Sequence, residues 1–253
     1  MTTALHKVPT RPVLKLAGHG HPKPDTAAPV RRACPADGEQ ANNTTATTLA
    51  IQQLVSAFQP AFDRMHVLRD LVIPMYEGSA VPTARFDVAL VCEAGVYLFE
   101  VKGWRNAVVY RKTAAQALPR WFLRQNGHSL AREVKDPAWQ CGRKTTHLRS
   151  LLPPDLRVQY FVLLPFEGVE LQGVMPSVVI TPQDLPYIAR VARNNGRTEQ
   201  SYPMLDDNAI DRTLRLLTGL QGNLTVDDHM RNSREKSAQA PVRPAHPGVL
   251  KLQ

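Results

Sequence analysis

The chain has 253 residues, a formal charge of +9, a pI of about 9.7 and 43% hydrophobic residues, which fits one globular domain with additional tails, or two very small domains. It contains no apolar stretch long enough to span a bilayer, and its three cysteines are too far apart in sequence to indicate a zinc site or a disulfide framework. The positive charge suits a polyanionic partner such as nucleic acid, although a basic surface kept for solubility explains it equally well.

The two ends of the chain differ from its middle. Residues 1–43 are rich in Pro, Thr, Ala, Gly and basic residues and follow no helical or strand period, so they are expected to form a disordered tail. Residues 222–253 have the same character and are expected to form a second disordered tail. The folded domain is therefore predicted to span residues 44–221. Val-Leu-Lys-Leu occurs in both tails, at 13–16 and 249–252, either by chance or as a repeated docking motif.

The N-terminus lacks the hydrophobic core of a secretory signal. A cytoplasmic protein without membrane contact is therefore expected. The sequence does not predict its oligomeric state.

The middle of the chain alternates between strand and helix patterns, starting with a helix that Thr48 is expected to cap and that ends near Pro60. Apolar and β-branched runs then predict strands over 67–73, 86–92, 96–101 and, as a short edge strand, 108–110. Further along, Pro137 fits the first turn of a helix that continues to about Leu151. Strands over 158–164 and 178–180 and helices over 185–192 and 209–217 complete the pattern. The fold class expected is α/β, with a central mixed sheet flanked by helices.

The segment before the Pro137 helix is harder to interpret. It interleaves basic and aromatic residues between the third strand and the helix: Arg120, Trp121, Phe122, Arg124 and Arg132. Two interpretations are open: a loop that stacks an aromatic ring on nucleic acid, or a loop whose aromatic side chains enter the core.

The chemically informative residues lie at the end of the strand over 96–101. Side chains alternate along a strand, so Glu100 and Lys102 share one face with Val96 and Leu98. The strand is apolar on both faces before Glu100, which indicates a buried central strand. Charged residues at the end of such a strand need a reason, and a surface Glu–Lys pair is the plainest alternative to a functional site.

The hairpin formed with the preceding strand brings Asp87 to the same place. If the loop is Glu93-Ala94, Val88 pairs with Phe99 and Asp87 lies opposite Glu100. If the loop is Ala94-Gly95, Asp87 lies opposite Lys102. Both registers place Asp87 on the face that carries Glu100 and Lys102, and only the intermediate register does not.

Two facing carboxylates repel each other unless a cation lies between them, and hard oxygen ligands suit Mg²⁺ or Mn²⁺. A lysine two residues after the glutamate can orient or deprotonate a water on the metal and stabilise charge on a phosphate. Asp87, Glu100 and Lys102 are therefore the predicted catalytic residues. Replacing any of them with alanine is expected to abolish activity and to leave the fold intact.

This ordered set of motifs resembles the PD-(D/E)xK nuclease superfamily, and more closely its nuclease-related domain (NERD) branch. The resemblance rests on Asp87, on Gly95 to Phe99 followed by Glu100-Val101-Lys102, on Trp104, and on Asp136-Pro137-Ala138-Trp139-Gln140. It covers residues 50–217 and neither tail. It implies a restriction-endonuclease-like fold and a Mg²⁺- or Mn²⁺-dependent nuclease acting on nucleic acid, with DNA the expected substrate.

The resemblance also implies roles for individual residues. Asp87 and Glu100 would hold the metal together with the carbonyl of Val101, and Lys102 would serve the attacking water. Gln140 would point from its helix towards the substrate, unless it is an ordinary surface glutamine. Lys144, one helical turn later, shares that face and is expected to meet a phosphate.

The sequence departs from the family pattern at two places. Asn106 stands where a glycine is usual, and asparagine is the next-best residue for a left-handed backbone. The glutamate that the family's first helix often carries near the metal falls at Gln52 or Gln53 here. A glutamine removes one negative charge, so weaker cation binding is expected, and Gln52 is the candidate site residue on this helix. A non-catalytic nucleic-acid-binding module of the same fold, or an interaction protein docked through its tails, are the alternatives to the nuclease.

Overall fold

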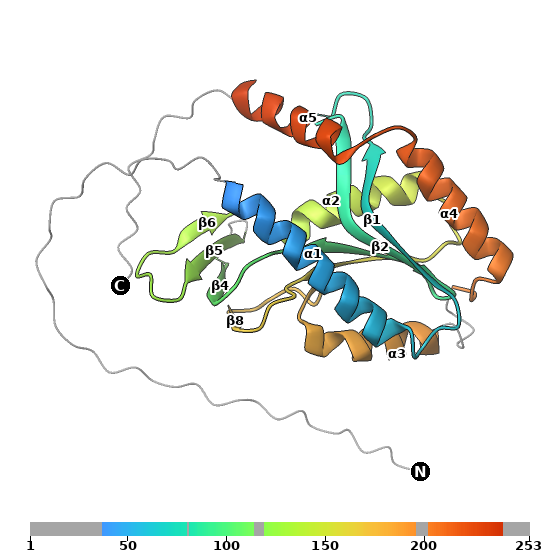
Figure 1. Ribbon diagram of the computed structural model, residues 1–253, viewed down its shortest axis with the longest axis horizontal. Helices are drawn as coiled ribbons and strands as arrows, with labels where there is room; N and C mark the ends of the chain where they lie inside the picture. Colours follow the sequence, from blue (N-terminus) through green and yellow to red (C-terminus); the bar gives the residue numbers. More distant parts are fainter. Residues whose placement is uncertain (1–36, 80, 114–118, 196–201, 240–253) are drawn as a thin grey trace, which may run out of the picture. The chain divides into compact units, whose positions relative to one another are not determined.

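The computed structural model describes residues 37–79, 81–113, 119–195 and 202–239, all within one compact unit, Pro35–Gln253 (Figure 1). The repeated tetrapeptides at 13–16 and 249–252 lie outside the described residues. Within the described part of the chain, no helix combines the length and the apolar character needed to cross a membrane.

The centre of the fold is a mixed five-stranded sheet in the order β1-β2-β3-β7-β9. Its strands are β1 (Met65–Pro74), β2 (Thr83–Cys92), β3 (Gly95–Val101), β7 (Val158–Leu163) and β9 (Val179–Ile180). The first three strands are antiparallel, whereas β3, β7 and β9 run parallel. The mixed sheet predicted from the sequence is therefore confirmed.

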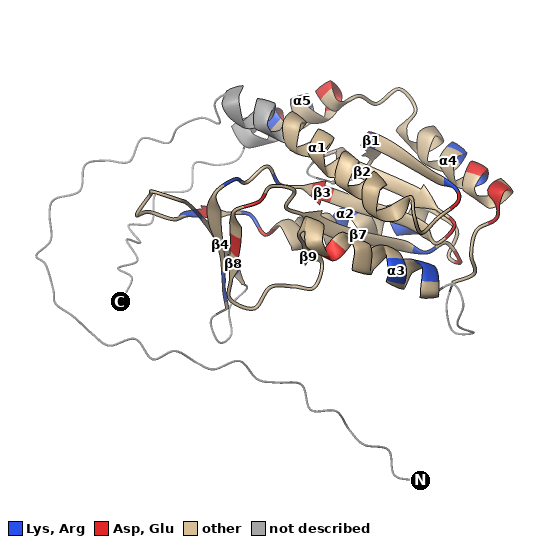
Figure 2. Ribbon diagram, turned by 60° about the horizontal axis from the view of Figure 1, so that its bottom comes forward, with Lys and Arg blue, Asp and Glu red and all other residues tan. Residues whose placement is uncertain are grey.

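Helices cover both faces of this sheet (Figure 1). On one face lie α1 (Asp37–Phe58) and α3 (Leu185–Asn195), and on the other α2 (Pro137–Leu151) and α4 (Asp207–Gln221). Strand β3 is buried between them: Tyr97 and Phe99 pack towards α1, and Val96 and Leu98 pack towards α2 and α4. A strand covered on both faces must be apolar on both, which explains the continuous hydrophobic run before Glu100. Figure 2 shows charged residues on α3 and α4.

A second sheet has the order β6-β5-β4-β8. It consists of β4 (Ala107–Lys112), β5 (Arg120–Gln125), β6 (Arg132–Val134) and β8 (Val169–Gln172). The loop expected around Trp121 is thus wrong, because residues 120–125 form a strand. Its residues alternate: Trp121 and Leu123 are buried, whereas Phe122 and Arg124 lie on the other face.

Helices extend beyond the predicted domain limits at both ends of the described residues. Helix α1 begins at Asp37 rather than at Thr48, although its first residues are polar and lack an apolar stripe. Helix α5 (Val226–Gln239) lies inside the stretch expected to be a disordered tail. Its start is fixed by Thr225 and Asp228, whose side chains each accept a hydrogen bond from the other residue's backbone N–H, as in a capping box. The domain limits of 44 and 221 stay a prediction, but secondary structure crosses both.

Candidate active site

The register of the β2–β3 hairpin places Asp87 opposite Glu100. Val88 pairs with Phe99 and Cys92 with Gly95, so the connecting loop is Glu93-Ala94, the first of the two registers considered. Gly95 has φ +116°, and a Cβ there would lie 2.4 Å from the carbonyl oxygen of Arg157. Glycine at this position therefore allows the turn and the close approach of the segment that leads into β7.

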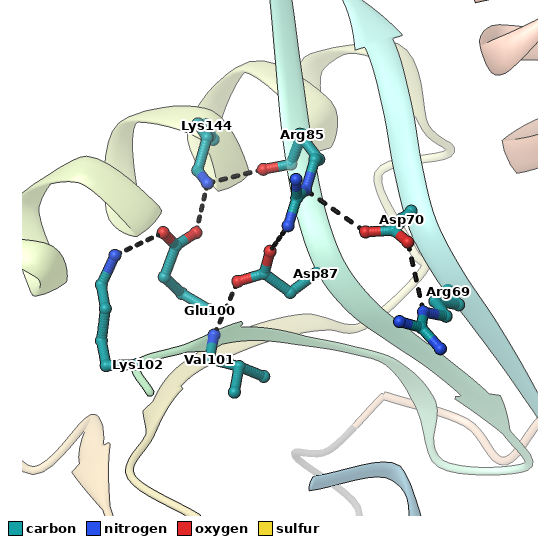
Figure 3. A network of polar contacts seen from close by, with 8 residues as sticks. All are labelled: Arg69, Asp70, Arg85, Asp87, Glu100, Val101, Lys102 and Lys144. Atoms are coloured by element: carbon teal, nitrogen blue, oxygen red, sulfur yellow. Dashed lines mark hydrogen bonds and ion pairs between the residues drawn. The ribbon is translucent and has the colours of Figure 1, made fainter. Parts of the chain in front are cut away.

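Both oxygens of the Asp87 carboxylate are occupied by donors. Oδ1 accepts a hydrogen bond from Nη2 of Arg85 at 2.5 Å, and Oδ2 accepts one from the backbone N–H of Val101 at 2.8 Å (Figure 3). The side chain is 12% exposed. Since the N–H and C=O of one strand residue point to the same side, the carbonyl of Val101 also points to the side of Asp87.

The Glu100 carboxylate is held by two lysines. Oε1 accepts from Nζ of Lys102 at 2.8 Å, and Oε2 accepts from Nζ of Lys144, which reaches across from α2. Lys144 also donates to the carbonyl oxygen of Arg85 at 2.6 Å. It therefore ties α2 to both strands of the hairpin (Figure 3).

The network continues along β1 to the first helix. Nε of Arg85 lies 3.3 Å from Asp70, and Asp70 in turn pairs with Arg69 at 3.2 Å. Arg69 donates to the hydroxyl of Thr48 on α1 at 3.5 Å. Asp70 has φ +55°, a left-handed conformation that aspartate adopts more readily than most residues.

The two carboxylates differ electrostatically. Burial works against ionisation of Glu100, but Lys144 and Lys102 outweigh it and hold the pKa of Glu100 well below its usual range. Burial and the charge on Glu100 raise the pKa of Asp87, against the opposing effects of Arg85 and Lys144. Glu100 is therefore the member of the pair that favours the ionised form, and Asp87 the one that takes up a proton more readily.

The oxygen ligands that this site offers are of the kind that divalent cations prefer. Asp87, Glu100 and the carbonyl of Val101 supply hard oxygens from adjacent strands, which Mg²⁺ and Mn²⁺ prefer. Two features weaken such a site. The described residues contain no group of three or more His, Cys, Asp or Glu side chains arranged for a metal ion. In addition, Arg85, Lys102 and Lys144 already neutralise the carboxylates that a metal would need.

Gln52 of α1 is exposed, and among the described residues no hydrogen bond or ion pair joins it to this network. Its neighbour Gln53 is half-buried and donates from Nε2 to the carbonyl oxygen of Pro165 at 2.9 Å. Oε1 of Gln53 is buried without a hydrogen-bond partner among the described residues. Thr48 of α1, predicted from the sequence as a helix cap, does contact the network, through Arg69.

Helix α2 carries Gln140 and Lys144 one turn apart, as predicted. Asp136 caps the helix by accepting from the backbone N–H of Trp139 at 3.0 Å, and Pro137 occupies the first turn, where it needs no donor. Gln140 is half-buried. Lys144 was expected to meet a phosphate, whereas the structure places its ammonium on Glu100.

Asn106 adopts the left-handed conformation predicted for it, with φ +43°. Its carbonyl oxygen accepts from the backbone N–H of Asn126 at 2.7 Å, which joins the start of β4 to the end of β5. Trp104, at the preceding turn, packs against the core beneath the second sheet. The segment after Lys102 thus connects the two sheets.

Two further groups near the site were not foreseen. Arg85 is not among the residues predicted from the sequence, although its position two residues before Asp87 puts both side chains on one strand face. His229 of α5 lies with Nδ1 2.9 Å from the hydroxyl of Thr83, at the start of β2. Burial and the charges of Lys144 and Arg85 lower the pKa of His229. Helix α5 therefore packs beside the charged residues of the site.

A mixed sheet between helical layers, with a carboxylate pair and an ExK motif at the end of its central strand, defines a restriction-endonuclease-like α/β domain. A comparison with protein families matches residues 39–165 to NERD, the nuclease-related domain. This match covers half of the chain and includes Asp87, Glu100, Lys102, Gln140 and Lys144, so the chain belongs to the nuclease-related domain family. Comparisons with curated proteins and with solved structures give no match.

Proposed function

We propose that the chain is a metal-dependent nuclease that hydrolyses phosphodiester bonds in DNA. The observation that carries the proposal is the convergence of Asp87 and Glu100 on one face at the end of the hairpin, with Lys102 bonded to Glu100 at 2.8 Å. The formal charge of +9 suits a polyanionic substrate.

Asp87, Glu100 and the carbonyl of Val101 would hold Mg²⁺ or Mn²⁺. A divalent cation bound there supplies a water of lowered pKa and neutralises charge on the phosphate. The Val101 N–H fixes one oxygen of Asp87, so this carboxylate keeps its orientation without a metal. The family's first-helix glutamate is a glutamine here, so the site has two protein charges rather than three and is expected to bind cations weakly.

The basic residues around the carboxylates have separate roles in this proposal. Lys102 is 23% exposed and has two further N–H donors, with which it orients the attacking water or a phosphate oxygen. Lys144 and Arg85 position Glu100 and Asp87 and offset their charge. Gln140, on the same face of α2 as Lys144, contacts the substrate.

The test is cleavage of supercoiled plasmid, linear duplex DNA and RNA by the purified chain, with Mg²⁺, Mn²⁺ or a chelator. The proposal predicts DNA cleavage that needs the metal and that Mn²⁺ supports at lower concentration than Mg²⁺, because Mn²⁺ binds such sites more tightly. Equal activity with chelator, or cleavage of RNA alone, would contradict it.

A second candidate is a nucleic-acid-binding module that keeps the fold and does not cleave. It is favoured by one observation: all four oxygens of Asp87 and Glu100 already accept from Arg85, Val101, Lys102 or Lys144. Salt-sensitive binding of DNA with no cleavage under any metal condition would identify this candidate.

A further inference from the structure

The outer side of α2 borders a groove of about 630 Å³ that is separate from the carboxylate pair. Its walls come from α2, from the segment between β1 and β2, and from the segment before β9. The residues that line it and bear on its chemistry are Tyr76, Trp139, Arg143, His147, Tyr160 and Val178.

Two aromatic side chains in this groove are exposed to solvent. Trp139 is 60% exposed and Tyr76 is 50% exposed. Single exposed aromatics are common, but two that line one groove from different segments form a surface on which a flat ring can stack.

The side chain of Arg143 contacts both aromatic residues. The guanidinium carbon of Arg143 lies 5.0 Å from the ring centroid of Trp139, and its Nη2 donates to the hydroxyl of Tyr76 at 3.0 Å. His147, one turn later on α2, contacts the ring of Tyr76 edge-on at 5.8 Å and bonds to the carbonyl oxygen of Pro74 at 2.9 Å. The position of Tyr76 is thus set by contacts with α2, with a positive charge beside the rings.

The groove and the carboxylate pair lie on different sides of α2. Arg143 immediately precedes Lys144, which binds Glu100, and successive helix residues point about 100° apart, so Trp139 and Lys144, five positions apart, point about 140° apart. A nucleic-acid strand that meets both the groove and the carboxylates therefore passes around this helix. At the base of the groove, a Cβ at Gly142 would lie 2.9 Å from the hydroxyl of Tyr160, so glycine lets the strand and the helix approach.

We propose that this groove binds an unpaired nucleobase of a nucleic-acid strand, with Trp139 and Tyr76 stacking on the base and Arg143 contacting its phosphate. The inference rests on the proposed function for the choice of a nucleic acid as the ligand. A paired base has both faces covered in the duplex, so an aromatic groove selects single-stranded segments, strand ends or opened duplex.

The experiment measures binding of fluorescently labelled oligothymidylate and of a DNA hairpin of equal length whose loop is a non-nucleotide linker, so that all its bases are paired, in chelator, where no cleavage occurs. Trp139→Ala is expected to weaken oligothymidylate binding about tenfold, the effect of losing one stacking contact of about 1.4 kcal/mol. Trp139→Phe keeps a ring and should recover most of this loss. Arg143→Gln should lower the salt dependence of binding by about one phosphate contact.

The matched control is Tyr187→Ala on α3. Tyr187 is 60% exposed and lies 5.5 Å from Arg190, so it repeats the aromatic–arginine pair outside this groove. The proposal is overturned if the unaltered chain does not bind oligothymidylate, or if Trp139→Ala binds it as tightly as the unaltered chain. It is also overturned if Tyr187→Ala weakens oligothymidylate binding as much as Trp139→Ala does, or if Trp139→Ala weakens hairpin binding as much as oligothymidylate binding. Binding in chelator is independent of cleavage, so a chain that binds through Trp139 and cleaves nothing keeps this inference and refutes the nuclease.

Discussion

The ion pair between Glu100 and Lys144 joins β3 to α2 in a part of the site that is shielded from solvent. Their side chains are 13% and 20% exposed, so neither is well solvated. The perturbation is Glu100→Met, which keeps the side-chain volume and removes the charge. Among the described residues, it leaves Lys144 with the carbonyl of Arg85 as its one hydrogen-bond acceptor.

Removing one partner of a buried pair costs about 3–5 kcal/mol, and the bond from Lys144 to the Arg85 carbonyl places the expected loss near the lower end, about 3 kcal/mol. Replacing both partners by apolar residues of similar size is close to neutral, so Glu100→Met/Lys144→Met should lie within about 1 kcal/mol of the unaltered chain. Glu133→Gln is the control, because its pair with Arg120 is exposed, with side chains 48% and 50% exposed, and an exposed pair contributes about 0–1 kcal/mol.

Urea unfolding is measured for Glu100→Met, Lys144→Met, the double variant, Glu133→Gln and the unaltered chain, with the free energy of unfolding extrapolated to water and the slope checked for constancy. The reasoning is refuted if Glu100→Met costs less than about 1 kcal/mol, or if the double variant is destabilised by the sum of the two single variants. This prediction revises the sequence-based expectation that every catalytic residue can be removed without affecting the fold.

Two further predictions concern the helices on either side of the site. Gln53→Glu should lower the free energy of unfolding by about 1–3 kcal/mol, because it replaces the donor to the Pro165 carbonyl with a second acceptor. The control, Gln52→Glu, should change it by less than about 0.5 kcal/mol. Urea unfolding measures both variants, and equal effects would show that the Gln53 contact does not stabilise the fold. Because the pKa of His229 is lowered in the folded chain, the unfolded chain binds the proton more tightly, so stability present above pH 6.5 should fall as pH drops below that value. His229→Gln should remove this part of the pH dependence, and an unchanged unfolding curve between neutral and acid pH would count against the burial of His229.

The hairpin was predictable from the sequence because its constraints are local. A short loop at Glu93-Ala94 and a glycine at 95 leave few registers, and a strand apolar on both faces fixes which end carries charge. The cap and first turn of α2 were predictable for the same reason, since Asp136 and Pro137 act on their immediate neighbours. Asn106 also followed from a local backbone preference.

The remaining features depend on contacts between distant segments. The pairing of Lys144 with Glu100 requires α2 to lie across β2 and β3, which no spacing in the sequence determines. Strand β5 became a strand because β4 and β6 pair with it on both sides. The first turns of α1 lack the apolar periodicity from which a helix is predicted. Helix α5 did carry a local signal, Thr225 and Asp228 three residues apart, that the composition of the tail obscured.

If Asp87 and Glu100 cleave phosphodiester bonds with a bound metal, as we propose, Asp87→Asn must lose this activity. Asparagine keeps an acceptor for the Val101 N–H and removes the charge that would bind the metal. The measurement is the rate of Mg²⁺-dependent plasmid cleavage by Asp87→Asn, by the exposed control Asp155→Asn and by the unaltered chain, each shown to be folded. We expect Asp87→Asn to lose at least about a hundredfold in rate and Asp155→Asn to lose none. Cleavage by Asp87→Asn at the rate of the unaltered chain would show that the charge of Asp87 is not needed for the reaction.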